Sequence, residues 1–471
     1  MLVACGRDEV QPQDAGWIVP DDDGGDANAI DAGTDVCTRD EGCATSVSAG
    51  RHLACAIKDG AVYCWGSSDF GALGTAPSKK DALDYFANER YKSTPQLVGG
   101  LPPATRVVAG DNFACALSHV GQIWCWGSND RGQLGHTAAI DGTCTRPDGG
   151  DLGACTPTPL PVDGISTSVH VVDLAVGDHA VCATTDDGDL YCWGSNVAGV
   201  AGQPLEQAYV LSAKLVATTA DLSKRTTHVA MALDEPFACA LRDDMTVWCW
   251  GDDRSGRVGR AIGTLDGCDG GCTATPTQVL ENDGGALSGV LRIAIGGASA
   301  CAQTASNVRC WGGNELGELA RGTWDGDPHP VPATAQVASG STALVGGGDT
   351  YFARDAFGQN LIWGRDEEGQ IGTGESYGAD TTQTQPCSLY NWSSPVAPGL
   401  CFGRAQILSS QYVTLSPGHQ FVAAIDRNGA VWAWGDEAAG ELGQPSDNFS
   451  DECDTHWFLP VSCLLHPQLV F

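Results

Sequence analysis

The sequence predicts an all-β protein, a seven-bladed β-propeller with disulfide-stapled blades and long inserts between strands. Three observations predict it. A Trp-Gly pair recurs seven times along the chain, and repetition at this period is typical of stacked supersecondary units. Gly, Asn, Asp and Pro cluster between short runs of Val, Ala, Tyr and Trp, as in β-proteins with many tight turns. No apolar 3.6-residue periodicity is sustained. The seven tryptophans are Trp65, Trp126, Trp193, Trp250, Trp311, Trp363 and Trp434.

The first copy of the repeat shows how each unit forms strands. Residues 53–57 and 61–66 are short alternating runs, and the turn between them ends in Gly60. Glycine tolerates the positive φ that such turns need, so the two runs predict a β-hairpin. A strand before the hairpin and one near Pro95–Val98 bring the unit to about four strands, the content of a propeller blade.

Composition divides the chain at about residue 45. Residues 1–45 contain an Asp- and Gly-rich stretch with few large apolar side chains, which predicts a disordered acidic tether. Residues 46–471 carry the repeats. Net charge is −33, which disfavours nucleic acid as a partner and favours solubility or the steering of basic partners. The aspartates of the tether lack EF-hand spacing, so we expect no metal site there.

The start of the chain, Leu2-Val3-Ala4-Cys5, resembles a bacterial lipobox, in which the cysteine carries a lipid. The basic and apolar regions of a full signal are missing, so a chance match is the alternative. The cysteine count favours the lipobox: 21 cysteines point to an oxidising compartment, and ten local pairs leave Cys5 over. We expect an exported protein, attached to the bacterial cell envelope through Cys5 or extracellular.

The predicted disulfides fall into two groups. Five pairs bracket the hairpins: Cys55-Cys64, Cys115-Cys125, Cys182-Cys192, Cys239-Cys249 and Cys301-Cys310. The sixth and seventh copies lack both members, with Ala353 and Ile362, and Ala423 and Ala433, in their place, as expected if the cysteines are bonded partners. The other five pairs lie outside the hairpins: Cys37-Cys43, Cys144-Cys155, Cys268-Cys272, Cys387-Cys401 and Cys453-Cys463. A zinc site at Cys268 and Cys272 is the weaker reading, because no second ligand pair accompanies them.

The repeat resembles that of the regulator of chromosome condensation family. The resemblance rests on G-x-H-x-C-A followed by D-G-x-V-Y-C-W-G-S and a later Gly-x-Leu-Gly, as at Gly50–Gly74, and it extends over about residues 46–471. It implies a seven-bladed propeller. Members of the family include a guanine nucleotide exchange factor and bacterial propellers that inhibit β-lactamases. The matching positions are framework positions, so the resemblance assigns no functional residue.

The segments after each Gly-x-Leu-Gly vary in length and mark the candidate binding face. They span about residues 75–94, 136–158, 203–228, 260–275, 321–330, 373–395 and 444–459. Because equivalent positions of a propeller lie on one side of the disc, we expect the inserts to crowd one face. Loop aromatics are typical binding anchors, although each could instead pin its own loop. The candidates are Tyr85, Phe86, Tyr91, Trp324, Tyr377, Tyr390, Trp392, Phe449 and Trp457.

Catalytic signatures are absent from the sequence. It contains no G-x-S-x-G, H-E-x-x-H or Walker-type loop. The acids after Trp-Gly, such as Asp252 and Asp253 or Asp366 to Glu368, fit turn positions. His52 and His179 occupy a position that Asn112 and Gln420 fill in other copies, which favours turn hydrogen bonding over metal binding.

Together these patterns predict a non-catalytic binding scaffold without cofactor or metal. Its expected partner is a protein or carbohydrate at the cell surface; membrane contact is expected only through the lipid, and the protein is expected to be a monomer. Three alternatives remain: an enzyme inhibitor, an extracellular hydrolase with acids at the channel, and an exchange factor. The last fits export and disulfides least.

Overall fold

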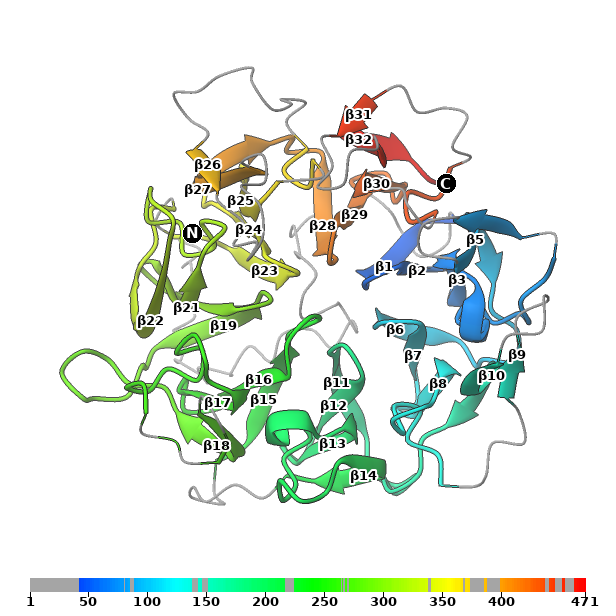
Figure 1. Ribbon diagram of the computed structural model, residues 1–471, viewed down its shortest axis with the longest axis horizontal. Helices are drawn as coiled ribbons and strands as arrows, with labels where there is room; N and C mark the ends of the chain where they lie inside the picture. Colours follow the sequence, from blue (N-terminus) through cyan, green and yellow to red (C-terminus); the bar gives the residue numbers. More distant parts are fainter. Residues whose placement is uncertain are drawn as a thin grey trace, which may run out of the picture.

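The computed structural model shows a closed ring of seven β-sheets around a central axis (Figure 1). The first strand begins at Ala44. Apart from strands, the described part of the chain contains the short 3₁₀ turns η1 (Asp69–Gly71) and η2 (Val197–Gly199), and none of its helices could cross a bilayer. The structure describes residues 42–79, 81–84, 89–137, 143–145, 151–216, 224–263, 265, 267–268, 271–337, 340–366, 369–372, 385–387, 399–436, 440–444, 451–453 and 461–471.

Each sheet is one blade built from consecutive antiparallel strands, as the repeat predicts. The innermost strands surround the axis: β1 (Ala44–Ala49), β6 (Ala104–Ala109), β11 (Val171–Val176), β15 (Thr226–Met231), β19 (Val290–Ile295), β23 (Ala343–Gly347) and β28 (Tyr412–Pro417). The second strands are β2 (Leu53–Lys58), β7 (Phe113–Ser118), β12 (Ala180–Thr185), β16 (Phe237–Arg242), β20 (Ser299–Thr304), β24 (Thr350–Arg354) and β29 (Phe421–Asp426).

The third and fourth strands complete the blades. The third strands carry the Trp-Gly pairs: β3 (Ala61–Ser67), β8 (Ile123–Ser128), β13 (Leu190–Ser195), β17 (Val247–Asp252), β21 (Val308–Asn314), β25 (Asn360–Arg365) and β30 (Val431–Asp436). The fourth strands are β5 (Glu89–Leu97), β10 (Asp151–Pro161), β14 (Tyr209–Leu215), β18 (Cys272–Gln278), β22 (Asp325–Thr334), β27 (Gly399–Leu408) and β32 (Val461–Leu469).

Four blades have a fifth strand that the four-strand repeat does not predict. In the first, second, sixth and seventh blades a three-residue strand from the insert pairs with the fourth strand. These strands are β4 (Ala82–Asp84), β9 (Thr143–Thr145), β26 (Gln385–Cys387) and β31 (Asp451–Cys453). An insert that folds back on the outer edge covers backbone groups that would otherwise be unpaired.

The seven Trp-Gly tryptophans join neighbouring blades. All seven side chains are fully buried. Each indole N–H donates a hydrogen bond of 2.7–3.0 Å to a backbone carbonyl of the preceding blade, in the Gly-x-Leu-Gly segment or the segment equivalent to it. The ring closes through Trp65, which donates to the Glu441 carbonyl of the seventh blade. A buried indole whose N–H has a partner combines a large apolar contact with a fixed direction.

The glycine after each tryptophan is required by a close backbone approach. Gly66 has φ +104°, and a Cβ there would lie 2.4 Å from the His52 carbonyl oxygen. No L side chain fits that space, so the third strand can pass this close to the turn only with glycine.

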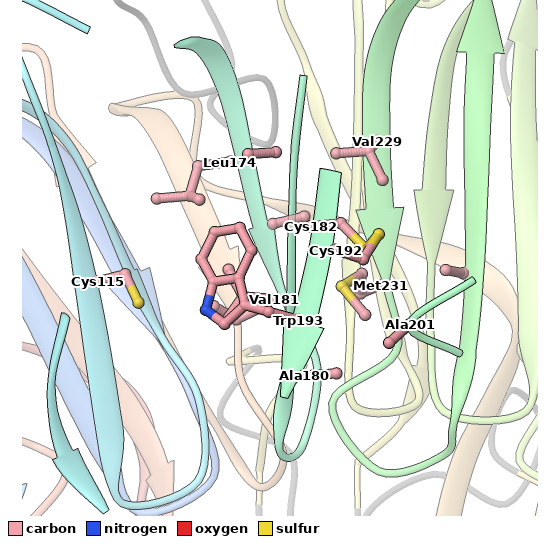
Figure 2. Close-up of a cluster of buried hydrophobic side chains, with 14 of the residues drawn as sticks. Cys115, Leu174, Ala180, Val181, Cys182, Cys192, Trp193, Ala201, Val229 and Met231 are labelled. Carbon is pink, nitrogen blue, oxygen red and sulfur yellow. A yellow bond between two sulfur atoms is a disulfide. The ribbon is translucent and has the colours of Figure 1, made fainter. Parts of the chain in front are cut away.

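In the five disulfide-bonded hairpins, alternating side-chain directions place the tryptophan and the disulfide on opposite sides of the sheet. Figure 2 shows Trp193 on one side and the Cys182–Cys192 bond on the other. Both belong to one apolar cluster that reaches from the second to the fourth blade. The core therefore lies between blades, and the bonded hairpins form part of it.

The disulfides among the described residues lie within hairpins and inserts. Five disulfides join directly paired residues of the second and third strands: Cys55–Cys64, Cys115–Cys125, Cys182–Cys192, Cys239–Cys249 and Cys301–Cys310. Cys144–Cys155 and Cys268–Cys272 are also bonded. Cys43 is disulfide-bonded, and its predicted partner Cys37 lies outside the described residues, as does Cys5. Cys387 and Cys401, like Cys453 and Cys463, lie on paired strands.

The sixth blade corrects one alignment made from sequence. Ile362 pairs with Phe352, whereas the sequence alignment placed Ala353 opposite Ile362. The ten-residue spacing from Phe352 matches the hairpin of the second blade, while the alignment used the nine-residue spacing of the first. Phe352 and Ile362 are fully buried, so an apolar pair replaces the disulfide there. In the seventh blade Ala423 pairs with Ala433, as aligned.

The chain end stays in the seventh blade. The repeat predicts this last strand only as far as about residue 463, which would leave residues 464–471 to pair beside the first blade; instead, β32 runs through Leu469 and pairs with β30. Only the last residue reaches across: Phe471 packs against Tyr63 and Trp65, with ring centroids 5.8 and 6.1 Å apart. The fourth strand of the last blade is thus complete within its own repeat, and side chains join it to the first blade.

Removing Leu464–Phe471 should lower stability strongly, because it deletes most of the fourth strand of the seventh blade and the Phe471 contact with Trp65. The measurement is the free energy of unfolding in guanidinium. Phe471→Ala should cost about 1–2 kcal/mol, since the ring is half-buried. Phe357→Ala is the control, because Phe357 is 91% exposed. An unchanged unfolding midpoint after the deletion would contradict this closure.

Candidate binding face

Strand direction brings two kinds of loop to one face of the disc. In every blade a backbone N–H at the end of the third strand or just after it donates to a carbonyl in the turn between the first and second strands. In the first blade Ser67 donates to His52 at 2.7 Å. The insert that follows the third strand therefore leaves from the same side as that turn. This side is called the insert face, and the expectation that inserts leave from one face agrees with the strand order.

Two of the nine aromatic candidates lie within the described residues. Tyr91, on β5, is half-buried, and a Cβ added to Gly440 would lie 2.6 Å from its ring. Tyr91 therefore packs against the seventh blade. Trp324 is half-buried between β21 and β22, in the fifth blade. The candidates Tyr85, Phe86, Tyr377, Tyr390, Trp392, Phe449 and Trp457 lie outside the described residues.

The turns between the first and second strands bring a set of ionisable side chains together at the axis. The turn of the fourth blade holds five residues between Met231 and Phe237, whereas that of the third holds three between Val176 and Ala180. This longer turn places Asp234 next to His419 of the seventh blade, where Asp234 Oδ1 lies 3.2 Å from His419 Nε2. Since these blades are not neighbours in the ring, the contact spans the axis.

Asp111, Asp178 and His179 form the adjoining part of this site. The His179 Nδ1 atom lies 2.7 Å from Asp178 Oδ2, and its Nε2 atom lies 4.0 Å from Asp111 Oδ2. Among the described residues these three alone form a set whose potential ligand atoms lie within 4.8 Å of one another. Three ligands are one fewer than a structural zinc site uses. These residues, with Asp234 and His419, are called the axial cluster.

Burial dominates the electrostatics of the axial cluster. It raises the pKa of Asp234 to about 7; the Asp349 and Asp178 charges add to this, and Arg51 and Arg365 oppose it. Burial also raises the pKa of Asp111. Both acids thus hold a proton more readily than an exposed carboxyl does.

The histidine of the cluster shifts in the opposite direction. Burial, together with the positive charges of Arg365 and Arg51, lowers the pKa of His419 to about 3. The imidazole is therefore neutral at pH 7. Its contact with Asp234 is then not an ion pair, and it leaves that carboxyl without a neutralising charge from blade seven.

A cavity of about 90 Å³ opens beside the axial cluster, between the third and fourth blades. Its apolar lining is Val197, Val200, Met231 and Pro236, and its acids include Asp178 and Asp234. Neither carboxylate oxygen of Asp234 accepts a hydrogen bond from the described residues. The cavity, called the axial pocket, thus combines an apolar wall with carboxylates that have unused acceptor capacity.

The acids singled out from the sequence are turn residues. Asp252 contacts Arg254 and Arg257, at 3.0 and 3.4 Å. Asp253 and Asp366 each accept a backbone N–H five residues ahead, at 2.9 and 2.7 Å. His52 contacts Glu441 of the seventh blade at 3.2 Å. These side chains stabilise loops and blade contacts, and none of them belongs to the axial cluster.

Sequence reasoning missed Asp111, Asp178, Asp234 and His419. One signal was available: the fourth copy has two extra residues between the strands, where the other copies carry a short Gly-led turn. Because this turn faces the axis in every blade, extra residues in it are expected to extend toward the axis. The same alignment places Asp178 and His419 at equivalent positions of the third and seventh turns.

The arrangement defines a class of protein: a rigid propeller ring that presents loops and an acidic axial site on one face. Residues 59–117 and 120–184 match the regulator of chromosome condensation (RCC1) repeat. A second description of the same repeat matches residues 104–133 and 171–200. Residues 59–117 and 120–184 therefore carry this repeat, and the ring as a whole is a seven-bladed propeller.

Curated relatives share this repeat at modest identity. The human E3 ubiquitin-protein ligase HERC2 is 28% identical over 322 residues, 67% of this chain and 6% of that protein, so the chain spans a small part of its length. The mitochondrial RCC1 domain-containing protein RUG3 of Arabidopsis thaliana is 25% identical over 85% of this chain and 86% of its own. The crystal structure of Prp20p from Saccharomyces cerevisiae superposes with TM-score 0.63 at 18% identity, covering 87% of this chain and 85% of that one.

Asp234 should make stability depend on pH. An unfolded aspartate ionises near pH 4, whereas Asp234 in the fold does so at about 7. Between these values the folded state holds a proton that the unfolded state releases, so this group's contribution falls as pH rises. Asp234→Asn should therefore gain stability over wild type at pH 7.5 relative to pH 5, measured by guanidinium unfolding. Asp187→Asn, at an exposed turn of the opposite face, is the control. If the free energy of unfolding of Asp234→Asn differed from that of the wild type by the same amount at both pH values, Asp234 would not have a raised pKa in the fold.

Proposed function

We propose that this protein is an exported, non-catalytic scaffold that binds a partner protein through its insert face. The observation that carries the proposal is the division of labour in the repeat. The recurring residues hold the blades together. The tryptophan N–H groups donate hydrogen bonds to carbonyls of the Gly-x-Leu-Gly segments, and the cysteines form disulfides across the hairpins. What varies between copies, the inserts and the axial turns, lies on one face.

The relatives support a binding role of this kind. Prp20p is described by its binding to Gsp1p and histones, and a propeller with this framework can present a different loop set to a different partner. A carbohydrate partner and the inhibition of an enzyme are forms of the same proposal, since both use a rigid face with variable loops. Exchange-factor activity is the form that an oxidising compartment fits least.

A hydrolase is the second candidate, and the axial cluster is the observation that favours it. Glycoside hydrolysis uses two carboxyl groups, one held protonated near neutral pH. Asp234 has a raised pKa, and Asp178 lies beside it in the axial pocket. The acids first considered from sequence, Asp252 and Asp253, do not line this site. Turnover of a glycan panel that is lost in Asp234→Asn would replace the scaffold proposal.

A pull-down tests the binding role. The full chain should capture one partner from cell-surface extract in a stoichiometric complex. A variant with Trp324, Trp392 and Trp457 changed to Ala should lose most of it, at least about tenfold, because aromatic anchors dominate interface energy. Phe357→Ala is the matched control, an exposed aromatic at a second-to-third-strand turn of the opposite face. Equal capture by both variants would sink the proposal.

Export with lipid attachment at Cys5 is part of the proposal, and it rests on the lipobox resemblance and on the disulfides. Globomycin, which blocks the lipoprotein signal peptidase, should cause an unprocessed precursor to accumulate when the gene is expressed with its native upstream sequence. Cys5→Ala should abolish fractionation with the membrane, whereas the exposed substitution Asp187→Asn should not. A chain secreted without lipid would exclude the anchor and leave the binding role standing.

A further inference from the structure

The axial pocket has the volume and lining of a site for one long, unbranched side chain. Its wall is apolar over Val197, Val200 and Met231, and its volume of about 90 Å³ accommodates a few heavy atoms rather than a folded ligand. Asp178 and Asp234 stand at the axial side. The pocket opens on the insert face, where a docking partner would reach it.

The carboxylates of the pocket are under-neutralised. Glu235, which also lines it, is paired with Arg254 and Arg257 at 3.3 Å. By contrast, the contacts of Asp178 and Asp234 are with histidines, at 2.7 and 3.2 Å. Arg131, at the rim, lies 3.6 Å from Asp130.

The wider axial site is negative as well. The carboxyls that act on one another there are Asp111, Asp178, Asp234 and Asp349, and the guanidinium groups that act on them are Arg51, Arg257 and Arg365. Four against three leaves one negative charge when all are ionised. His52, His179 and His419 face the same space. A cation that enters the pocket would meet this excess together with unused acceptor oxygens.

We propose that the axial pocket receives the side chain of a lysine presented by the partner protein. This rests on the proposed scaffold function and names the chemistry of its partner. A lysine stem is apolar and unbranched, and its ammonium group offers three donors to Asp178 and Asp234. An arginine guanidinium is planar and larger than an ammonium group, so we expect it to fit a cavity of about 90 Å³ less well. The net charge of −33 would steer a basic partner toward the disc.

The probe is n-butylammonium, which reproduces the lysine side chain. Ligand-observed saturation-transfer NMR on the full chain at pH 7.5 should show saturable binding. Neutral n-butanol should not bind, and n-butylguanidinium should bind more weakly. Asp178→Asn and Asp234→Asn should each weaken n-butylammonium binding at least about fivefold. Asp187→Asn, an exposed acid of the same blade on the opposite face, should leave it unchanged.

A second variant tests the pocket without removing charge. Val197 is 52% exposed at the rim, so Val197→Trp should block entry while the fold stays intact, as checked by its melting temperature. The proposal would be overturned if n-butylammonium showed no saturable binding, or if n-butanol bound as strongly as n-butylammonium. It would also be overturned if both Asn variants bound n-butylammonium as strongly as the wild type. Calcium, manganese or zinc ions that bind at Asp111, Asp178 and His179 and exclude n-butylammonium would overturn it as well, because the site would then be a metal site.

The two proposals fail separately. If n-butylammonium binds as expected but the pull-down captures no partner, the lysine pocket is supported and the scaffold function is wrong. If a partner is captured through the insert aromatics but n-butylammonium does not bind, the scaffold function stands and the lysine pocket is wrong.

Discussion

The hydrogen bond from each indole N–H to the preceding blade is the interaction on which the rest of the structure depends. It repeats seven times at 2.7–3.0 Å and closes on itself, from Trp65 to the Glu441 carbonyl. A single blade cannot bury its tryptophan, so the blades are stable only as a ring. The disulfides strengthen individual hairpins, and the described hairpins of the sixth and seventh blades have Phe352 with Ile362 and Ala423 with Ala433 in place of one.

Because the framework fixes every blade, sequence and length can vary in the two kinds of loop on the insert face, the outer inserts and the axial turns. Outer inserts add fifth strands in four blades. At the axis, two extra residues in one turn suffice to place Asp234 against His419 across the ring. Burial then raises the pKa of Asp234 and lowers the pKa of His419, so it favours the neutral form of each group. The axial site is thus held by rigid strands, which is the usual requirement for a specific binding site.

The predictions from sequence agree with the structure where a feature depends on residues close together in the chain, and they fail where it depends on distant contacts. The hairpins, their paired cysteines and the Trp-Gly positions depend on residues within about ten positions of one another, and repetition revealed them. Two expectations failed where spacing was ambiguous or the contact was distant. The sixth hairpin was aligned one residue off, at Ala353. The chain end was expected to pair beside the first blade, whereas β32 completes the seventh and only Phe471 crosses.

The sequence by itself determined the repeat, the number of blades, the hairpin disulfides and the face from which the inserts leave, because each follows from local strand order. Only the tertiary structure decided which side chains meet at the axis. Asp111, Asp178, Asp234 and His419 come from the turns of four different copies, and their spacing along the chain does not indicate which of these turns meet. Closing seven blades into a ring brings their turns to one point, and that convergence creates both the axial cluster and the pocket beside it.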